Sequence, residues 1–453
     1  QAVRAFMHMV NYRRSQETLI ETPPSIPQEF TPDTARARTV LDGVLQAGRS
    51  WLTEPEAKQV LEAYAIPVGA TQVAATPHEA AAIAARLGVP VALKILSPDV
   101  IHKTDVGGVA LGLEGPAAVE AAAVTMLARV SRERPDAHIE GFAVETMIRR
   151  PGAHELIVGV LDDVQFGPVI LFGQGGTAVE VLADRALALP PLNMRLAREL
   201  MARTRIYKLL EGVRGQPTAD LDEIALTLIK VAQLVTDFAE IVELDVNPLL
   251  ADDFGVMALD ARIKVGPARG SGTDRLAIRP YPKELEETLT LQDGQTVLLR
   301  PVMPEDEPSL QRGFAKLTPE EIRLRFFAPL KALSHVQAAR FSQIDYDREM
   351  ALLLTDPGIP GTTDIYGVVR IVADPNNERA EYAIIVRKDM TGRGLGRLLM
   401  QRIIDYARRR GIAVLFGDVL RENTAMLELC KALGFSRSTH PDEPDLVRVE
   451  LAL

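Results

Sequence analysis

Closely spaced glycines in the C-terminal third are the sharpest chemical feature of the sequence. Gly392, Gly394 and Gly396 follow the apolar stretch EYAIIV and lead directly into a basic amphipathic stretch that contains Arg397 and Arg402. Such glycines let successive backbone N–H groups point at one oxyanion, and the positive end of a following helix adds its dipole. The pattern predicts a cradle for a pyrophosphate, while a Gly-rich turn with solvated arginines explains the glycines alone equally well.

The spacing of these glycines argues against two common nucleotide motifs. It reads G-x-G-x-G, whereas the dinucleotide fingerprint is G-x-G-x-x-G and the P-loop is G-x-x-x-x-G-K-[ST]. Neither an NAD site nor a P-loop is therefore expected here.

A second set of chemical groups lies in the middle of the chain. Lys94 stands inside the apolar run VALKIL, and HKTDVGG and then FGQGG, with Gly175 and Gly176, follow it. Farther on, ELDVNPL and ALDARI supply Asn247 and Asp260, whose oxygens are hard ligands of the kind that Mg²⁺ takes together with phosphate oxygens. Each piece alone is a weak signal, because a strand lysine is usually a surface residue and a glycine pair is usually a turn.

Composition indicates a globular, acidic chain. Its 453 residues are 47% apolar and 25% charged, which predicts about three folding units. Lys and Arg number 51 against 61 Asp and Glu, a net charge of -10, which argues against a nucleic-acid or membrane-surface binder. No apolar run approaches the roughly 18 residues of a membrane span. The single cysteine, Cys430, cannot form an internal disulfide, so a cytoplasmic location is expected.

Two irregular stretches rich in Pro, Gly and Ser divide the chain. They are ETPPSIPQEFTPD near the N-terminus and VGPARGSGTD before the C-terminal third, and neither favours a regular element. Because the chain starts at Gln1, we expect it to be a fragment of a longer protein. The expected segments are a stub with linker at 1–38, a middle domain at 39–265, a linker at 266–290 and a C-terminal domain at 291–453.

Helical and strand patterns alternate in both domains. EPEAKQVLEAY and PHEAAAIAARLG have helical periodicity, while PVALKIL, ELIVGVL and GPVILFG are short apolar runs typical of strands. In the C-terminal domain, IYGVVRIV and EYAIIV predict a strand pair, followed by a helix, a strand and another helix. The fold class expected is therefore α/β (α+β), with a mixed sheet flanked by helices at the C-terminus.

Residues from about 295 to 453 resemble the GNAT-family acetyltransferases. In that family the acetyl-CoA pyrophosphate lies in a loop of pattern [QR]-x-x-G-x-[GA], matched here from Thr391 to Gly396, although Thr391 replaces the usual Gln or Arg. A CoA-contacting Asn at the start of the next helix is matched in RENTAMLELCKALGF. The resemblance implies that acetyl-CoA is bound by Ile385, Val386, Thr391, Gly392, Arg393, Gly394, Gly396, Arg397 and Asn423.

The same resemblance implies a general base. A lysine ammonium with a pKa near 10.4 must lose a proton before it attacks a thioester, and lysine acetyltransferases of this family place a glutamate on the strand that leads to the cradle. Glu381 in EYAIIV matches it, with an exposed strand-end glutamate as the alternative. Cys430 stands where many relatives carry a Tyr that protonates the leaving thiolate. In LELCKALG it is expected to be a small buried residue rather than a nucleophile.

The middle motifs, in their order, resemble the ATP-grasp domain of the nucleoside-diphosphate-forming acyl-CoA synthetases. HKTDVGG and DVNPL carry the resemblance, which covers about residues 45 to 265. It implies that Lys94 contacts the ATP phosphates, that Glu145 lies at the adenine hinge, and that Asn247 and Asp260 hold Mg²⁺. The paired glycines of FGQGG are expected at the same ATP site.

His102 is the candidate for a phosphate relay in this domain, because a histidine carries phosphate between distant sites in those synthetases. A hydrogen-bonded histidine that orders the loop is an equal alternative. These synthetases also need a CoA-binding half and a first phosphohistidine, which we do not find in this sequence. A complete ligase cycle is therefore not expected, and the stub at 1–38 is interpreted as the end of a preceding CoA-ligase-like domain.

The order ATP-grasp then GNAT, with LTPEEIRLRFF after the first C-terminal strand, resembles the bacterial Pat-type protein lysine acetyltransferases. This resemblance implies acetylation of AMP-forming acyl-CoA synthetases on an active-site lysine, with no nucleic-acid or membrane partner. One alternative is an ADP-forming acyl-CoA synthetase with an appended acetyltransferase. Another is a non-catalytic metabolite sensor, whose middle domain biases the GNAT domain. The oligomeric state stays open.

Overall fold

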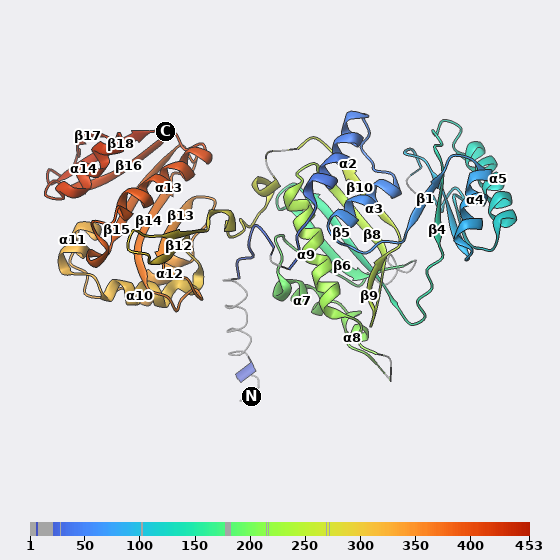
Figure 1. Cartoon of the computed structure of the whole chain (residues 1–453), viewed down its shortest axis with the longest axis horizontal. Coiled ribbons are helices and arrows are strands. Elements are labelled where there is room, and N and C mark those ends of the chain that lie inside the picture. The colour runs from blue at the N-terminus through green and yellow to red at the C-terminus, as the bar shows by residue number, and fades with distance from the viewer. Residues whose placement is uncertain are drawn as a thin grey trace. The chain divides into compact units, whose positions relative to one another are not determined.

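The computed structural model describes residues 6–7, 21–27, 29–100, 103–176, 183–213, 215, 217–268, 270 and 272–453. The chain forms two compact units (Figure 1): the middle unit, Pro27–Ile278, and the C-terminal unit, Arg279–Leu453 together with Gln1–Ile26. The expected mixed α/β architecture is confirmed in both. Within the described ranges, no helix is long and apolar enough to cross a membrane.

The first part of the middle unit is a four-stranded antiparallel sheet with two helices. The strand order is β1-β4-β2-β3, and buried side chains of α4 and α5 pack with those of the sheet in one apolar cluster. The elements are β1 (Thr71–Ala74), α4 (Pro77–Leu87), β2 (Val91–Leu96), β3 (Val109–Leu113), α5 (Pro116–Glu133) and β4 (Gly141–Thr146).

Local sequence explains where α4 begins and ends. The Thr76 side chain accepts a hydrogen bond from the backbone N–H of Glu79, and Pro77 occupies the first turn, where its missing N–H costs nothing. At the other end Gly88 adopts a left-handed conformation with φ of 63°, which a glycine takes without strain. The helical pattern PHEAAAIAARLG is thus confirmed.

The second part of the middle unit is a six-stranded antiparallel sheet packed with helices. The strand order is β10-β8-β5-β6-β7, with β9 paired to β8. Its elements are α2 (Thr34–Gln46), α3 (Glu54–Ala63), β5 (His154–Asp163), β6 (Gly167–Gln174), β7 (Arg185–Ala188), α7 (Met194–Ala202), α8 (Tyr207–Leu210), α9 (Leu221–Asp237), β8 (Ile241–Asp252), β9 (Gly255–Ala258), β10 (Ala261–Val265) and the 3₁₀ helix η1 (Gly272–Arg275).

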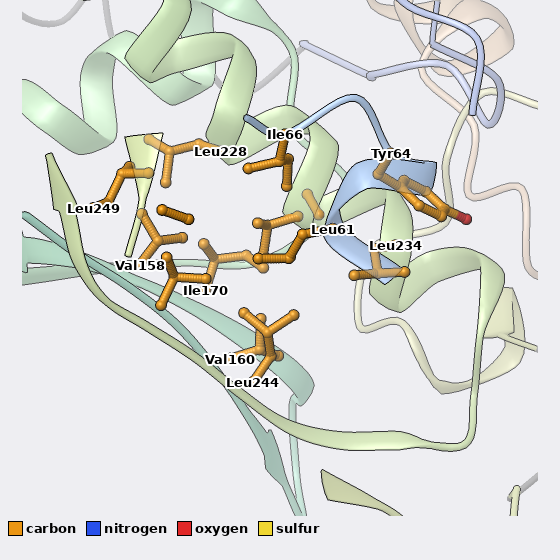
Figure 2. Packing of buried hydrophobic residues seen from close by; sticks show 14 of the residues in the cluster. Leu61, Tyr64, Ile66, Val158, Val160, Ile170, Leu228, Leu234, Leu244 and Leu249 are labelled. Carbon is orange, nitrogen blue, oxygen red and sulfur yellow. The ribbon is translucent and has the colours of Figure 1, made fainter. Parts of the chain in front are cut away.

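The core of this part lies between α9 and the six-stranded sheet. Figure 2 shows Leu228 and Leu234 of α9 in one apolar cluster with Val158, Ile170 and Leu249 of the strands, and all five are fully buried. Burying one such side chain contributes about 1.5–3 kcal/mol. This core holds β8, which carries the predicted metal ligand Asn247.

The C-terminal unit is built on one eight-stranded sheet of order β11-β12-β13-β14-β15-β16-β18-β17. Its elements are η2 (Lys283–Leu285), β11 (Glu287–Thr290), β12 (Thr296–Pro301), η3 (Pro304–Asp306), α10 (Glu307–Ala315), α11 (Pro319–Phe326), α12 (His335–Ser342), β13 (Glu349–Thr355), β14 (Ile365–Ala373), β15 (Arg379–Val386), η4 (Lys388–Met390), α13 (Leu395–Arg409), β16 (Val414–Leu420), α14 (Thr424–Ala432), β17 (Ser436–Thr439) and β18 (Leu446–Ala452).

Both faces of this sheet are covered. Side chains along a strand alternate between faces, so Val369 of β14 packs in the cluster that contains Leu399 of α13, whereas Val368 packs with Leu310 of α10. The residues before Pro27 belong to this unit too, because Pro24 forms an isolated bridge with Tyr281.

A buried ion pair joins β12 to the turn before α10. The Asp306 carboxylate accepts two hydrogen bonds from the Arg300 guanidinium, at 2.6 and 2.7 Å. It also accepts the backbone N–H groups of Met303 and Gly361. Arg300 is 2% exposed and Asp306 is fully buried, so each charge depends on the other.

Candidate functional site

Strands β15 and β16 separate partway along their length. They pair in parallel only from Arg379↔Val414 to Glu381↔Phe416. Beyond that point β15 stays paired with β14 up to Val386, while β16 follows β18. The β15 backbone after Glu381 therefore has no strand partner on its β16 side. An extended ligand with amide groups can pair there, next to the backbones of Ile385 and Val386.

The predicted anion cradle lies at the start of α13. Gly392 and Gly394 have φ of 80° and 77°, which favours glycine at both positions. A Cβ added to either would meet nothing within 4 Å, so the loop borders open space. Gly394 is the N-cap of α13 and no side chain caps that end, which leaves the first helical N–H groups available to an anion.

The side chains around the cradle have different partners. Arg393 forms an ion pair with Asp293, the hydroxyl of Thr391 donates to the backbone oxygen of Lys388, and Arg397 is exposed. Asn423 is the N-cap of α14, where its side chain accepts from the backbone N–H of Met426. Gly396 lies in the first turn of α13.

Glu381 lies at the point where the two strands part. It is solvent-exposed, and the alternation of β15 places it on the same face as Ala383 and Ile385. Those two residues line a cavity of about 90 Å³ between the sheet and α10–α12. The Glu381 carboxylate also interacts electrostatically with Arg325 of α11. A carboxylate thus stands beside the cavity that an acceptor amine would enter.

Cys430 is fully buried, as expected from LELCKALG. Its sulfur lies 3.1 Å from the hydroxyl of Tyr382, whose ring packs edge-on against Phe435. Burial raises the pKa of the Cys430 thiol. The pKa of Tyr382 is also raised, mainly by burial and to a lesser extent by the nearby Cys430. Both groups are protonated at neutral pH and pack as part of the core.

The middle unit contains a cluster of five charged side chains, four of them buried and the fifth, Lys103, partly exposed. The carboxylate of Glu54 pairs with Lys94, with Lys103 at 2.6 Å and with Lys58 at 3.1 Å. Glu145 pairs with Lys58 at 2.6 Å and with Lys94 at 3.1 Å. The three lysines exceed the two glutamates by one positive charge. A small cavity lined by Glu54 and Lys103 adjoins the cluster.

Burial and mutual charge set the pKa values in this cluster. Burial alone would raise the pKa of Glu54, but the three lysines outweigh it and the pKa falls well below its usual value. Burial and then the charge of Glu54 raise the pKa of Glu145. Burial alone would lower the pKa of Lys94. The carboxylates of Glu54 and Glu145 outweigh that effect and raise the pKa. Lys94 therefore remains cationic and suited to a phosphate oxygen.

The predicted metal ligands lie near Lys94. Asp260 and Lys94 interact electrostatically, and the side-chain oxygen of Asn247 accepts the backbone N–H of Gly176 at 2.9 Å. Asp245 is also close: burial, together with Asp260 and Glu243, raises its pKa to about 6, although Arg262 opposes the shift.

Two mutually repelling carboxylates and an amide fit Mg²⁺, which takes one or two protein carboxylates together with phosphate and water oxygens. Among the residues that the structure describes, no group of three or more His, Cys, Asp or Glu forms a closed metal site. Bound there, Mg²⁺ would neutralise the carboxylates and orient nucleotide phosphates.

Close backbone packing explains the glycines of FGQGG. A Cβ on Gly175 would lie 2.3 Å from the Leu156 oxygen, and one on Gly176 would lie 1.9 Å from a Glu155 carboxylate oxygen. The two glycines thus bring the chain against β5 and place a backbone N–H at Asn247. His102, the predicted phosphate relay, lies outside the described residues.

Sequence reasoning missed several members of these sites. Glu54 and Lys58 share the buried face of α3 with Ala57 and Leu61, so two charges in an apolar stripe were the available signal. Arg370 likewise stands in the middle of the apolar strand run VVRIV and is 9% exposed.

Two family matches agree with this geometry. Residues 43–265 match the ATP-grasp domain family, and residues 323–435 match the acetyltransferase (GNAT) family. The first range contains the charged cluster with its candidate nucleotide residues. The second contains Glu381, the cradle and Asn423.

Relatives of the whole domains are also similar. The β subunit of the ADP-forming acetate–CoA ligase I of Pyrococcus furiosus is 35% identical over 51% of this chain and 97% of that protein. An acetyltransferase of Pseudomonas aeruginosa is 32% identical over 36% of this chain and 88% of its own length. The solved GNAT domain of S. lividans PAT is 28% identical over 38% of this chain and 99% of that domain, with a TM-score of 0.35.

Single-chain ADP-forming ligases match the same region, and this chain spans only about a third of their length, 33% and 37% in two cases. The likeness thus covers the β-subunit part of those enzymes. The chain belongs to two families at once, through its middle unit to the ATP-grasp β subunits of ADP-forming acetate–CoA ligases and through its C-terminal unit to the GNAT acetyltransferases.

Proposed function

We propose that this chain is a Pat-type protein lysine acetyltransferase, which transfers the acetyl group of acetyl-CoA to a lysine of AMP-forming acyl-CoA synthetases. The observation that carries the proposal is the position of Glu381, where β15 parts from β16 and on the cavity-facing side of the sheet. The choice of acceptor rests on the domain order, which resembles that of the Pat-type enzymes.

In the proposed reaction, the cradle at Gly392–Gly396 holds the pyrophosphate of acetyl-CoA through backbone N–H groups. Glu381 accepts a proton from the lysine ammonium, directly or through one water. The neutral amine attacks the thioester carbonyl, and a backbone N–H of Ile385 or Val386 stabilises the oxyanion. The intermediate collapses to the amide as the C–S bond breaks, and the leaving CoA thiolate takes up the second proton of the attacking nitrogen.

The ATP-grasp domain has a regulatory or vestigial role in this proposal. Lys94 and the cluster around Glu54 would contact nucleotide phosphates, and Asn247 with Asp260 would hold Mg²⁺. Nucleotide binding without turnover would favour a sensor role.

The test combines acetyl-CoA with a purified AMP-forming acetyl-CoA synthetase. Thioester consumption and lysine acetylation, read by mass spectrometry, are compared for the wild-type chain, Glu381→Gln and Glu378→Gln. Glu378 is an exposed carboxylate just before β15 and serves as the matched control. Loss of a general base should slow acetylation by about 100-fold or more in Glu381→Gln and leave Glu378→Gln close to wild type. A Glu381→Gln rate within a few-fold of wild type would remove Glu381 from the mechanism.

The second candidate is an ADP-forming acyl-CoA synthetase with an appended acetyltransferase. The buried cluster around Lys94 favours it, because its excess positive charge suits nucleotide phosphates. ATP cleavage to ADP that depends on a free carboxylic acid and CoA, with labelled phosphate recovered on His102 and no protein acetylation, would replace the first proposal with this one.

A further inference from the structure

The cavity beside Glu381 is lined by three arginines and by no acidic residue. It lies between α10–α12 and strands β13–β15, and its volume is about 90 Å³. Phe314, Phe326 and Phe341 form much of its apolar wall. Charged groups in such surroundings are costly unless they are paired. The partners of each arginine therefore show whether the chain itself supplies a carboxylate that neutralises it.

Arg387 is fully compensated inside the chain. Its guanidinium pairs with Asp389 at 2.6 Å and with Asp364 at 3.4 Å, and it also lies over the ring of Tyr366. This arginine needs no ligand.

Arg370 is compensated only in part. It pairs with Glu349 at 3.3 Å and donates to the backbone oxygen of Phe341 at 3.1 Å. Its Nε is buried and has no hydrogen-bond partner, and the whole residue is only 9% exposed. One buried donor therefore stays unsatisfied in the ligand-free chain, and leaving such a donor unpaired is costly.

Arg325 has no carboxylate within ion-pair distance in the part of the chain that the structure describes. It projects from α11 with its guanidinium 4.9 Å from the centre of the Phe326 ring. Burial and then the charge of Arg370 lower its pKa to about 10, while Glu381 opposes the shift. Arg325 is still cationic at neutral pH, so the cavity holds a positive charge that lacks a close counter-ion.

Two arginines that repel each other are thus held in an apolar cavity beside the proposed reaction centre. We propose that this cavity binds a carboxylate, carried either by the transferred acyl chain or by the acceptor amine, with Arg325 as its principal partner and Arg370 as the second. A planar guanidinium matches a carboxylate with two parallel hydrogen bonds. This inference rests on the proposed acyl transfer and widens it, because acetyl and a lysine within a protein carry no carboxylate, so the ligand belongs to a further acyl donor or acceptor of the same site.

The cavity has room for a small ligand group. Its volume is about 90 Å³, and a single water molecule needs about 10–15 Å³ on the same measure. Malonyl and succinyl groups, which are short acyl chains that end in a carboxylate, are the candidates on the donor side.

The donor arm of the test measures binding of succinyl-CoA and butyryl-CoA to the full chain by calorimetry. The two acyl groups have the same number of carbons, and only succinyl carries a carboxylate. We expect wild type to prefer succinyl-CoA by about 10- to 100-fold. Arg325→Gln should lose that preference while binding butyryl-CoA as before, and Arg325→Lys should keep part of it.

The acceptor arm follows acetyl transfer from acetyl-CoA to Nα-acetyl-lysine and to its neutral amide. A preference for the acid that disappears in Arg325→Gln assigns the carboxylate to the acceptor. The control for both arms is Arg323→Gln, which removes an exposed arginine of the same helix that pairs with Glu422 instead. It should behave as wild type.

Equal treatment of acid and neutral probes in both arms would overturn the inference. So would a preference that survives in Arg325→Gln or disappears in Arg323→Gln. If acetylation of the synthetase still depends on Glu381 in that case, the proposed function stands and only the carboxylate site fails. Unchanged butyryl-CoA binding by Arg325→Gln shows that this variant remains folded.

Discussion

Glu54→Gln is the change that tests the charged cluster of the middle unit most directly. The substitution keeps the shape of the side chain and removes its charge. In the wild-type chain this carboxylate is 1% exposed and pairs with Lys58, Lys94 and Lys103. After the change Lys58 and Lys94 share one carboxylate, Glu145, and Lys103 loses its ion-pair partner.

The expected loss follows from that imbalance. Removing one partner of a buried ion pair costs about 3–5 kcal/mol, since the other charge stays buried without compensation. For a unit of this size each kcal/mol corresponds to about 2–4 °C, so the melting temperature should fall by roughly 6–20 °C. The loss should shrink in acid. The folded pKa of Glu54 lies well below its usual value, so its stabilisation is complete above the unfolded pKa of about 4.3 and disappears as the pH falls through the folded pKa.

Trp51 allows the unfolding of the middle unit to be measured separately. It is the only tryptophan in the chain, lies three residues before Glu54 and lines the same small cavity. Its fluorescence during urea unfolding therefore reports on the middle unit alone. The control is Glu62→Gln on the same helix, because Glu62 is 44% exposed and pairs only with Arg36 in the described structure; it should lose less than about 1 kcal/mol.

A Glu54→Gln chain that unfolds within about 1 kcal/mol of wild type at neutral pH would refute this reasoning. It would mean that Glu54 is solvated in solution, and that the lysines do not depend on it. Equal losses in Glu54→Gln and Glu62→Gln would have the same meaning.

Three further outcomes are expected. Asp306→Asn should destabilise the C-terminal unit by about 3–5 kcal/mol because it leaves Arg300 buried and unpaired, as read by near-ultraviolet circular dichroism of tyrosine. Gly394→Ala should weaken CoA binding about 5- to 10-fold in calorimetry through left-handed strain, whereas Gly411→Ala, with φ of 75° and equally open space, should leave it unchanged. Asp245→Asn should stabilise the ligand-free middle unit by about 3 kcal/mol at pH 7.5 and lose that advantage only as the pH falls below about 4, because the folded pKa of about 6 lies above the unfolded value of about 3.9.

Periodicity predicted most of the elements that position the sites. The runs PVALKIL, ELIVGVL and GPVILFG form β2, β5 and β6, and the pair IYGVVRIV and EYAIIV forms the adjacent antiparallel strands β14 and β15. The helix after the cradle begins at Leu395, directly after Gly394. These elements combine an apolar pattern with clear stop signals, so local physics is sufficient to define them.

Other strands were not assigned from sequence. β13, EMALLLT, is a short apolar run in the middle of the sheet, and periodicity alone does not distinguish such a strand from a buried helical segment. β17, SRST, is exposed at all four residues and forms only because β18 offers it an edge. Neither strand is specified by its own sequence, because β13 depends on pairing with β12 and β14 and β17 depends on pairing with β18.

The charged residues of the two sites also depend on partners that the local sequence does not reveal. A charge that the fold places among apolar side chains, such as Glu54 on α3 or Arg325 in the cavity, must be compensated by something that the local sequence does not contain. For Glu54 the partners come from elsewhere in the middle unit, as Lys94 and Lys103. For Arg325 no carboxylate within pairing distance comes from the described residues. The two cases begin with the same pattern, and the difference between them separates a cluster that stabilises the fold from a cavity that awaits an acidic ligand.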